Sequence, residues 1–406
     1  MQDNEKKPAL RFKGFTDPWE QRKVGTLIED YTEKTVTQNQ YPVLTSSQQQ
    51  GIVLQEDYFA DRQVTTDNNV GYYVLPKGYF TYRSRSDTDV FVFNRNNIVD
   101  KGIISYYYPV FAPKSCDSNF LLRRLNHGIK KQLSMAAEGT GQKVLAHAKF
   151  KNMVVDVPSQ SEQEKIGTIL EELDTLITLH QRKYEKLVNI KKSMLDKMFP
   201  KNGASVPEIR FKGFTDPWEQ RKLEEYLEVS GQKNFEGIYT KEDVLSVSGD
   251  FGIVNQIEFQ GRSFAGASVA NYGVVETGDI VYTKSPLKSN PYGIIKANKG
   301  KNGIVSTLYA VYKPKQSANP EFVQIYFEQD ARMNNYMHPL VNKGAKNDMK
   351  VSAENALKGQ IVFPDIKEQR TISEFFHNLD TLITLHQRKL EKLQNIKKSC
   401  LEKMFV

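Results

Sequence analysis

The chain of 406 residues is poor in cysteine and has no long apolar segment. Its two cysteines, Cys116 and Cys400, form no C-x-x-C pair, which argues against a disulfide scaffold or a structural zinc site. Apolar runs such as residues 90–93 are only a few residues long, whereas a membrane-spanning helix needs roughly 20. Residues 1–7 mix both charges and lack the apolar core of a signal peptide. We therefore expect a soluble cytoplasmic protein with no membrane partner.

The sequence also lacks recognisable catalytic motifs. It contains no G-x-x-x-x-G-K-[ST] phosphate-binding loop, and its histidines are scattered without a nearby nucleophile or carboxylate constellation. The segments that begin at Asp17, Asn290 and Asn319 are similar to the (D/N)PP(Y/F/W) loop of amino-methyltransferases, but each lacks the second proline. We expect a non-catalytic chain that has no metal site and binds no cofactor of its own.

The charge of the chain gives only a weak indication of its partner. There are 56 Lys and Arg residues against 48 Asp and Glu, which gives a net charge of +8, and the pI is about 9.0. An excess of basic residues favours an anionic partner such as nucleic acid, but this excess is small for the length of the chain. Composition alone leaves DNA binding undecided.

Two blocks of sequence occur twice and define the organisation of the chain. Residues 11–23, RFKGFTDPWEQRK, recur unchanged at residues 210–222. Residues 173–199 recur at residues 379–405 with 23 of 27 positions identical. Internal repetition of this kind indicates tandem structural units. Each unit consists of a short motif, a long middle segment and a C-terminal block.

The two middle segments share only a faint pattern. Residues 43–53 match residues 244–254 in Val-Leu, a serine and Gly-Ile-Val at the same spacing, and residues 102–114 match residues 303–315 in a similar way. Both segments contain β-branched and aromatic runs broken by Gly, Pro and Asn, which predict short strands. Shared apolar and glycine positions with divergent polar residues predict one fold that carries two different surfaces.

The repeated C-terminal blocks predict two long helices that start after Pro158 and Pro364. Apolar residues alternate at spacings of four and three over three heptads, which is the pattern of a coiled coil. Two nearly identical helices in one chain favour mutual antiparallel packing. We expect His180 and His386 in the seam rather than on a metal ion, because no second ligand lies at i±4. The expected seam positions are Ile166, Leu170, Leu173, Ile177, His180, Tyr184, Leu187, Ile372, Phe376, Leu379, Ile383, His386, Leu390 and Leu393.

These features predict an α+β fold with pseudo-twofold symmetry, in which two tandem, mostly β globular domains are joined by the two long helices of an antiparallel coiled coil. A further helix is expected near the end of each domain, over residues 119–134 and 320–337. The expected boundaries are residues 1–157 for the first domain, 158–201 for the first spacer helix, 202–363 for the second domain and 364–406 for the second spacer helix.

Cations, amides and aromatic residues cluster in the middle segments. Arg83 and Arg85 are two residues apart near the end of an expected strand, so both side chains point to the same face. Arginine can pair with guanine and amides with adenine, whereas lysine mainly holds phosphate. A solvated surface group explains any one of them, but as a set in divergent domains they indicate DNA contacts. The candidate DNA-binding residues are Gln48, Gln49, Gln50, Arg83, Arg85, Arg95, Lys130, Lys131, Lys284, Lys288, Asn290, Lys343 and Lys346.

The order of these features resembles the specificity (S) subunit of type I restriction–modification systems. The resemblance rests on the twin RFKGFTDPWE motif, the variable middle segments, the P-x-x-x-E-Q helix start and the LDTLITLHQRK helix, and it covers essentially the whole chain. It implies two target recognition domains, each of which recognises one half of a split, asymmetric DNA target, with the spacer helices setting the gap. The implied partners are double-stranded DNA, two modification subunits that carry S-adenosylmethionine and methylate adenine, and restriction (motor-nuclease) subunits that use ATP and Mg.

Identical aromatic residues in the first repeated block are candidate docking surfaces for the modification subunits, although core packing explains them equally well. They are Phe12, Phe15, Trp19, Phe211, Phe214 and Trp218. Two other functions stay open. One is a coiled-coil adaptor whose middle segments bind proteins, which would show no salt-dependent affinity for DNA. The other is an orphan subunit that acts in methylation without cleavage, which this sequence does not distinguish from part of a full restriction system.

Overall fold

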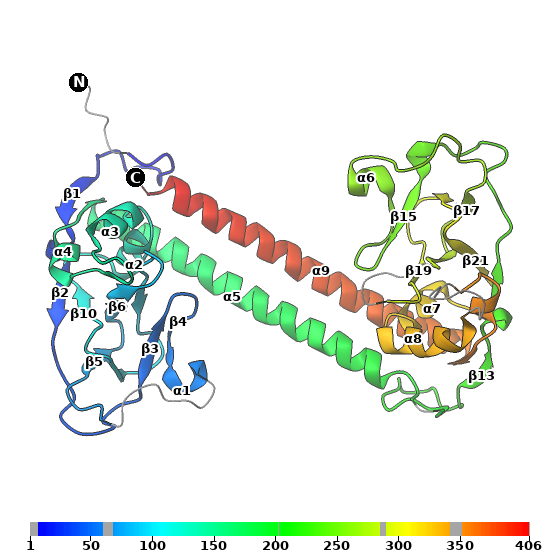
Figure 1. Cartoon of the computed structure of the whole chain (residues 1–406), viewed down its shortest axis with the longest axis horizontal. Helices are drawn as coiled ribbons and strands as arrows, with labels where there is room; N and C mark the ends of the chain where they lie inside the picture. Colours follow the sequence, from blue (N-terminus) through cyan, green and yellow to red (C-terminus); the bar gives the residue numbers. More distant parts are fainter. Residues whose placement is uncertain (1–6, 60–67, 202, 285–289, 342–350, 406) are drawn as a thin grey trace. The chain divides into compact units, whose positions relative to one another are not determined.

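The computed structural model of the chain describes residues 7–59, 68–201, 203–284, 290–341 and 351–405 (Figure 1). The chain forms two compact units. The first consists of residues 1–181 together with 387–406, and the second consists of residues 182–386. Two helices of 38 residues, α5 (Gln160–Lys197) and α9 (Ile366–Lys403), each contribute one part to each unit.

The globular part of the first unit is built from short antiparallel strands, followed by helices. Its four-stranded sheet has the order β2-β10-β6-β8, and four two-stranded sheets, β1-β12, β3-β4, β5-β9 and β7-β11, accompany it. The strands are β1 (Glu20–Lys23), β2 (Ile28–Tyr31), β3 (Leu44–Ser47), β4 (Gly51–Leu54), β5 (Tyr73–Pro76), β6 (Phe80–Tyr82), β7 (Arg85–Ser86), β8 (Phe93–Arg95), β9 (Lys101–Ile104), β10 (Val110–Pro113), β11 (Lys143–Val144) and β12 (Val154–Val157). The helices are α1 (Gln55–Tyr58), α2 (Ser118–Asn126), α3 (Lys130–Ala136), α4 (His147–Lys151) and the 3-10 turn η1 (Val24–Thr26).

The globular part of the second unit repeats this plan. Its four-stranded sheet has the order β14-β21-β18-β19, with the two-stranded sheets β13-β22, β15-β16 and β17-β20. The strands are β13 (Glu219–Lys222), β14 (Leu227–Val229), β15 (Leu245–Ser248), β16 (Gly252–Asn255), β17 (Gly273–Val275), β18 (Ile280–Tyr282), β19 (Ile295–Ala297), β20 (Gly303–Val305), β21 (Ala310–Pro314) and β22 (Gln360–Phe363). The helices are α6 (Gln256–Gln260), α7 (Pro320–Tyr326), α8 (Asp330–Met337) and the 3-10 turns η2 (Leu223–Glu225), η3 (Lys241–Asp243), η4 (His338–Leu340) and η5 (Asn355–Leu357).

Corresponding strands lie in the same order in the two four-stranded sheets. The inner strands β6 and β18 are fully buried along their length, and both consist of aromatic or β-branched residues. Such residues pack well on the pleated surface of a sheet, which is why these short runs become strands. The predicted α+β fold with two sheet-rich domains and two long helices is confirmed.

The helix expected near the end of each domain is broken into two. In the first unit α2 ends before His127, and Gly128 adopts a φ of +91° ahead of α3. This left-handed conformation cannot continue a helix and favours glycine. In the second unit α7 and α8 are separated by residues 327–329. The sequence predicted helices over 119–134 and 320–337 without these breaks.

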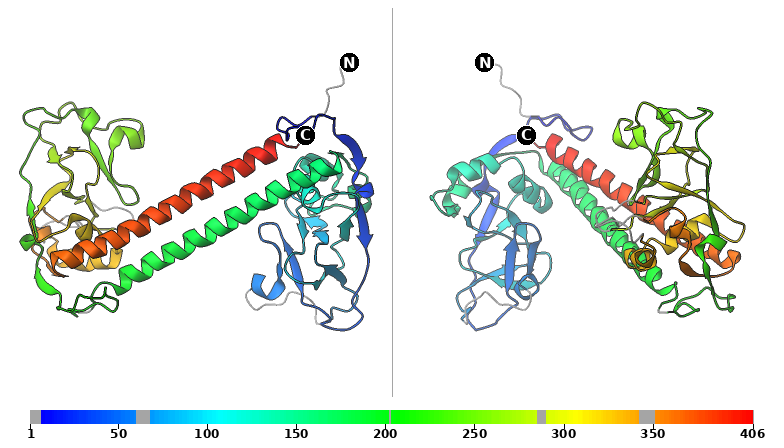
Figure 2. Two further views of the ribbon diagram at one scale, coloured as in Figure 1. Left: turned by 180° about the vertical axis from the view of Figure 1, so that it is seen from behind. Right: turned by 45° about the vertical axis from the view of Figure 1, so that its right-hand side comes forward.

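The long helices pack through the expected seam. Within each unit the segments of α5 and α9 run side by side (Figure 2). All fourteen expected seam positions are buried or half-buried, including His180 and His386, whereas most positions between them are exposed. Ion pairs join the helices, between Asp174 and Lys397 in the first unit and between Lys191 and Asp380 in the second. In the second unit Phe199 also lies against Phe376, with ring centroids 6.3 Å apart, so the two helices run antiparallel there.

Identical residues of the repeated motifs form the same ion pair in each unit. Arg11 donates two hydrogen bonds to Glu162, at 2.9 and 2.6 Å, and a third to the backbone carbonyl of Asp17 at 2.8 Å. Arg210 donates two hydrogen bonds to Glu368, both at 2.7 Å. Both glutamates are buried in the first turn of a long helix. The RFKGF motif and the P-x-x-x-E-Q helix start therefore recur together because each arginine holds the start of one helix.

The glutamine that follows each glutamate fixes the neighbouring helix. Gln163 accepts a hydrogen bond from the backbone N–H of Asp117 at 3.0 Å, and Gln369 accepts one from that of Asn319 at 2.9 Å. Asp117 and Asn319 are the N-caps of α2 and α7. In the first unit a Cβ on Gly167 would come within 2.3 Å of the Asp117 carboxylate, so glycine is needed for α2 to approach α5.

The segment before each RFKGF motif bonds to the end of a long helix. The backbone N–H of Leu10 donates to the carbonyl of Lys403 at 2.8 Å, and that of Ile209 donates to the carbonyl of Lys197 at 2.9 Å. In the first unit the two partners come from opposite ends of the chain, whereas in the second they are close in sequence. The same contact is therefore made with and without a direct chain connection.

No helix within the described ranges is long and apolar enough to cross a membrane.

Candidate nucleic-acid interface

The turn of the β3–β4 hairpin carries three of the candidate DNA-binding residues, Gln48, Gln49 and Gln50, and all three are exposed. The hydroxyl of Ser47 accepts hydrogen bonds from the backbone N–H groups of Gln49 and Gln50, both at 3.2 Å. Gly51 closes the turn with a φ of +75°, a conformation that glycine adopts without strain. The backbone of this turn is thus held in place, and its amide side chains lie at the surface.

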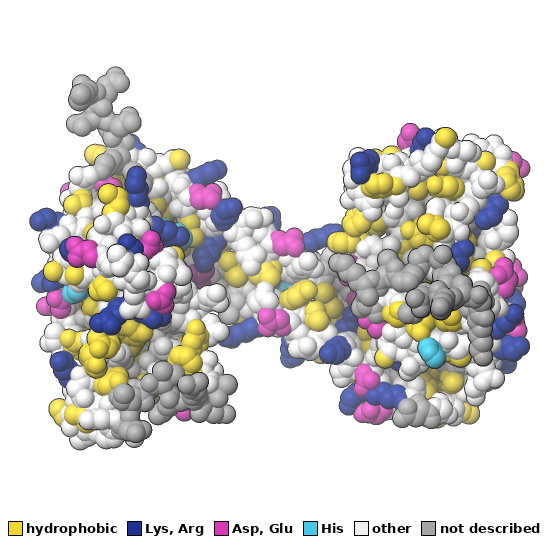
Figure 3. Space-filling view, in the orientation of Figure 1, with side chains coloured by type: hydrophobic (Ala, Val, Ile, Leu, Met, Phe, Trp, Pro, Cys, Tyr) yellow, Lys and Arg dark blue, Asp and Glu magenta, His cyan; other side chains and the backbone are white. Residues whose placement is uncertain are grey.

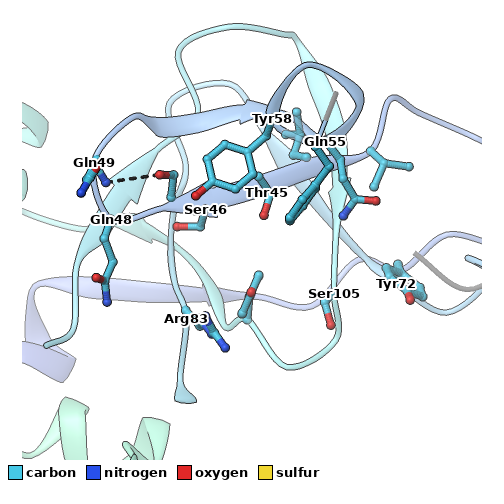
Figure 4. Close-up of a pocket in the computed structure, with 14 residues that line it drawn as sticks. Thr45, Ser46, Gln48, Gln49, Gln55, Tyr58, Tyr72, Arg83 and Ser105 are labelled. Carbon is cyan, nitrogen blue, oxygen red and sulfur yellow. Dashed lines mark hydrogen bonds between the residues drawn. The ribbon is translucent and has the colours of Figure 1, made fainter. Parts of the chain in front are cut away.

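A cavity of about 550 Å³ lies beside this turn (Figure 4). Arg83 lies across the cavity from Tyr58, and the glutamines of the turn lie at one side. Guanidinium and amide groups can hydrogen-bond to base edges, and aromatic rings can stack on bases. The fold therefore brings together candidate residues that are far apart in sequence. The polar and aromatic lining includes Ser46, Gln48, Gln49, Gln55, Tyr58 and Arg83.

The two arginines of the strand end have different neighbours: Arg83 lies near Asp87, and Arg85 lies against an exposed tyrosine. Arg83 is half-exposed, and its guanidinium is 3.9 Å from the carboxylate of Asp87. The guanidinium of Arg85 lies over the ring of Tyr107, 4.5 Å from its centroid, which is a cation–π contact. Tyr106 and Tyr107 are both exposed in the turn between β9 and β10, with ring centroids 4.2 Å apart. Sequence reasoning missed these tyrosines, although two aromatic residues at a predicted turn were a usable signal.

The corresponding place in the second unit has different side chains. Lys284 follows β18, has a φ of +53° and donates a hydrogen bond to the backbone carbonyl of Thr307 at 3.0 Å. Leu308, the next residue of the turn between β20 and β21, is exposed. A cation therefore lies beside the same turn in both units, but threonine and leucine replace the tyrosine pair.

The space beneath the hairpin also differs between the units. Strand register places Asn94 of β8 where the second unit has Lys296 of β19. Asn94 donates hydrogen bonds to the hydroxyl of Ser46 and the carbonyl of Ser47, both at 2.8 Å, which ties the hairpin to β8. Lys296 is buried and lines a cavity of about 630 Å³, which the candidate residue Asn290 also lines. One fold thus presents two chemically different surfaces.

Other candidate DNA-binding residues lie away from the hairpin. The guanidinium of Arg95 donates hydrogen bonds to Ser118 and Asn119 at 2.9 and 2.7 Å, and burial lowers its pKa. Arg95 therefore ties β8 to α2, and we leave it out of the proposed interface. Lys130 and Lys131 are exposed at the start of α3. Three further candidates, Lys288, Lys343 and Lys346, lie outside the described residues.

The repeated tryptophans belong to the cores of the two units. Trp19 and Trp218 are buried, with 4% and 3% of their surface exposed. Trp19 packs edge-on against Phe405, with ring centroids 6.2 Å apart, and Trp218 packs in the same way against Phe199 at 6.0 Å. These contacts favour the core-packing interpretation of the two tryptophans over partner docking.

The repeated phenylalanines are half-buried. Phe12 and Phe211 pack against the core of their own unit. Lys165 lies over the ring of Phe15, 4.9 Å from its centroid, and Phe214 is also half-buried. Part of the surface of each of these four rings is therefore buried within the chain, and the rest is exposed.

Sequence reasoning missed a group of exposed leucines on the long helices. Leu176 and Leu179 of α5 are 43% and 52% exposed, and the equivalent Leu382 and Leu385 of α9 are each 45% exposed. Residues three apart lie on the same face of a helix. The usable signal was the identity of these leucines in both blocks at positions outside the expected seam.

Neither a patch of one charge on the visible face nor a metal-binding cluster marks a further site in the described part of the chain. Basic and acidic side chains are interspersed over the visible face of each unit (Figure 3). Within the described ranges, no group of three His, Cys, Asp or Glu residues is arranged to hold a metal ion.

Comparison with known proteins agrees with the repeats. Residues 17–189 match the family described as the type I restriction modification DNA specificity domain. This part of the chain is similar to the type I DNA specificity domain. The resemblance to type I specificity subunits that the repeated motifs predicted is confirmed. The second unit has the same order of strands in its main sheet and the same repeated motifs.

Two curated relatives come from Methanocaldococcus jannaschii. The chain is 23% identical to the putative type I restriction enzyme MjaX specificity subunit over 300 residues, which is 69% of this chain and 65% of that protein. It is 22% identical to the type I restriction enzyme MjaVIII specificity subunit over 278 residues, 66% of this chain and 64% of that protein. The matched region thus spans slightly less than two thirds of either relative.

A solved structure shows the same fold as this chain. The crystal structure of the type I restriction–modification system S subunit from M. genitalium matches with a TM-score of 0.56 and 13% sequence identity. The match covers 98% of this chain and 99% of that one.

Proposed function

We propose that the chain is the DNA-recognition subunit of a type I restriction–modification complex, and that it recognises an asymmetric target in two separated halves. In this proposal residues 1–157 and 202–363 are the two target recognition domains, and residues 158–201 and 364–406 form the spacer. Each domain recognises one half-site. The matched specificity domain and the repeated architecture support this assignment.

The observation that carries the proposal is the divergence of one hairpin on a shared fold. The turn between β3 and β4 reads Gln48-Gln49-Gln50, whereas the turn between β15 and β16 reads Gly249-Asp250-Phe251. The two hairpins occupy the same place in the strand pattern of their units. Amides suit adenine, whereas a carboxylate accepts from cytosine. Two domains with one framework and different surface chemistry are suited to two different half-sites.

In the first domain the proposed contact surface consists of Gln48, Gln49, Arg83, Arg85 and the Tyr106–Tyr107 turn. The two arginines supply bidentate donors, and the glutamines supply donor–acceptor amides. The tyrosines add aromatic faces and hydroxyl groups beside Arg85. Lys130 and Lys131 are proposed to contact phosphate, because lysine binds phosphate without reading a base.

We propose that the chain itself is not a catalyst and that modification subunits supply the chemistry. They would bring S-adenosylmethionine for adenine methylation, and restriction subunits would bring ATP and Mg. Leu176 and Leu179, with their equivalents Leu382 and Leu385, are the proposed contact points for two identical modification subunits. Repeated apolar surface suits two copies of one partner, because the same patch is presented twice.

Replacement of one domain tests the bipartite proposal. Residues 24–157 are exchanged for the corresponding segment of another specificity chain, and the variant is co-expressed with a modification subunit. Methylated sites are then mapped by sequencing of cellular DNA. One half of the methylated motif should change, and the other half should stay as in the parent. A change in both halves would refute the assignment of one half-site to each domain.

A further inference from the structure

A charged pair between the long helices recurs in the two units. In the first unit Asp174 of α5 forms an ion pair with Lys397 of α9. In the second unit Lys191 of α5 forms one with Asp380 of α9, at 2.7 Å. Asp174 and Asp380 are equivalent positions of the repeated block, and so are Lys191 and Lys397. Each unit therefore contains the same Asp–Lys pair, made between the two copies of the helix.

The globular part of each unit contacts this pair with the opposite charge. In the first unit Arg123 of α2 contacts the carboxylate of Asp174 and lies 3.3 Å from that of Glu171. In the second unit Glu328, which follows α7, accepts a hydrogen bond from Lys191 at 2.6 Å. The side chains of Arg123 and Lys191 are only 16% and 18% exposed. Partly buried pairs are screened by salt less than surface pairs, so these contacts contribute to holding each domain.

The two globular parts reach the pair from positions that do not correspond. The N-caps Asp117 and Asn319 align α2 with α7, so the place of Arg123 is taken by Ile325 in the second unit. Glu328 lies beyond the end of α7. The domains have thus diverged in both the position and the sign of the contact, whereas the helices have kept both charges.

We propose that each Asp–Lys pair is a two-sided attachment surface for a globular domain. A domain that presents a cation binds the aspartate, and a domain that presents an anion binds the lysine. In both cases the residue of the pair that the domain does not contact keeps its ion pair with the residue on the other long helix. The partner that fits is a sheet-rich domain of this fold with either an arginine on the helix equivalent to α2 or a glutamate just after that helix.

This surface explains how two nearly identical helices carry two divergent domains. Its value for target recognition rests on the proposed function, because different half-sites require different domains. The attachment itself does not depend on DNA. It can therefore be tested on the full chain alone, by amide hydrogen exchange in α2 and α7, which reports local opening of each domain from the helices.

Equivalent aspartates should behave differently. Asp174→Asn removes the negative charge that Arg123 contacts on α5 and leaves only the more distant carboxylate of Glu171, so exchange in α2 should become about tenfold faster, the factor that about 1.4 kcal/mol produces. Asp380→Asn, the matched control, leaves the contact of Lys191 with Glu328 in place, and exchange in α7 should stay within about twofold of the parent. Equal effects of the two substitutions would contradict the proposal.

Equivalent lysines should show the reverse pattern. Lys191→Met removes the donor to Glu328, so exchange in α7 should rise by about tenfold. Lys397→Met leaves Arg123 bound to Asp174, and exchange in α2 should stay close to that of the parent. An effect of Lys397→Met on α2 as large as that of Lys191→Met on α7 would overturn the assignment.

A charge reversal tests whether the surface is two-sided. In Arg123→Glu the new carboxylate should be taken by Lys397, so exchange in α2 should be no faster than in Arg123→Ala. Combining Arg123→Glu with Lys397→Met should then cost more than the two single effects together. If Arg123→Glu is much worse than Arg123→Ala and Lys397→Met adds nothing, the surface accepts only cations in that unit and the proposal is wrong. Because no DNA is used, such a result leaves the proposed recognition function standing.

Discussion

Removal of Arg210 should destabilise the second unit strongly, because it leaves a buried carboxylate without its partner. Glu368 is fully buried and accepts two hydrogen bonds of 2.7 Å from the Arg210 guanidinium. The same guanidinium donates to the carbonyl of Asp216 at 2.6 Å. Breaking a buried ion pair by deleting one partner typically costs about 3–5 kcal/mol. We therefore expect Arg210→Ala to lower the free energy of unfolding of the second unit by about that amount.

The two tryptophans allow each unit to be followed separately. The chain has one tryptophan in each core, Trp19 in the first unit and Trp218 in the second. In a Trp19→Phe background, urea unfolding followed by fluorescence reports the second unit alone. The comparison is made between this background with and without Arg210→Ala, so that the cost of the phenylalanine cancels.

A double substitution separates the ion pair from simple packing. Replacing both Arg210 and Glu368 with methionine removes both charges, and such replacements are often neutral or stabilising. The double variant should therefore recover most of the stability that Arg210→Ala loses. If Arg210→Ala costs less than about 1 kcal/mol, or if the double variant is as unstable as the single one, the argument from a buried unpaired charge is refuted.

Three further predictions concern the recognition surface, pH and docking. Arg83→Ala and Arg85→Ala should each cost roughly 1–3 kcal/mol of DNA affinity and relax one half-site, whereas unchanged methylation of the parent motif at the parent rate would remove both from the interface. Burial, with a smaller effect of nearby cations, lowers the pKa of His127 to about 4. The unfolded chain therefore takes up this proton first, and stability should fall as the pH drops from about 6.5 to about 4. His127→Gln should flatten that part of the stability curve, and an unchanged curve would argue against a neutral, half-buried histidine. Replacing all four exposed leucines, Leu176, Leu179, Leu382 and Leu385, with aspartate should abolish co-purification with the modification subunit while the circular dichroism spectrum stays unchanged; retained binding would move the docking surface elsewhere.

Much of the architecture could be predicted because it follows from periodicity and repetition. The spacing of apolar residues along the C-terminal blocks predicted two long helices, and these helices form. The weak pattern shared by the middle segments predicted one fold with two surfaces, because glycines and buried strand residues are restricted more than exposed ones. The order of the strands in the sheets could not be predicted from the sequence, because the pairing of short strands depends on contacts between distant segments.

The functions of the repeated residues could be predicted only in part. The identity of the RFKGF and P-x-x-x-E-Q motifs indicated a shared role, but not that Arg11 reaches Glu162 across 151 positions. Trp19 was therefore considered for docking, although it fills the core. Leu176 was not considered, because an isolated helix pattern does not distinguish an exposed apolar residue from a packed one.

The candidate DNA-binding residues illustrate the same limit at a finer scale. Proximity of Arg83 to Gln48 depends on how the β3–β4 hairpin folds against the sheet, which no local pattern specifies. Arg95 has the same composition signal as Arg83, yet its guanidinium is bonded to α2. Tyr107 becomes a candidate DNA-binding residue only because its ring lies under the guanidinium of Arg85. Contacts between segments, rather than residue type, decide which cations face a ligand.

The most direct test of the account is methylome sequencing of DNA from cells that co-express this chain with a cognate modification subunit. The account predicts N6-methyladenine on one split, asymmetric motif, and loss of this mark when the chain is omitted. A soluble complex with the modification subunit that produces no new motif would contradict the recognition function. Absence of any such complex, together with no salt-dependent DNA affinity, would instead favour a coiled-coil adaptor that binds proteins.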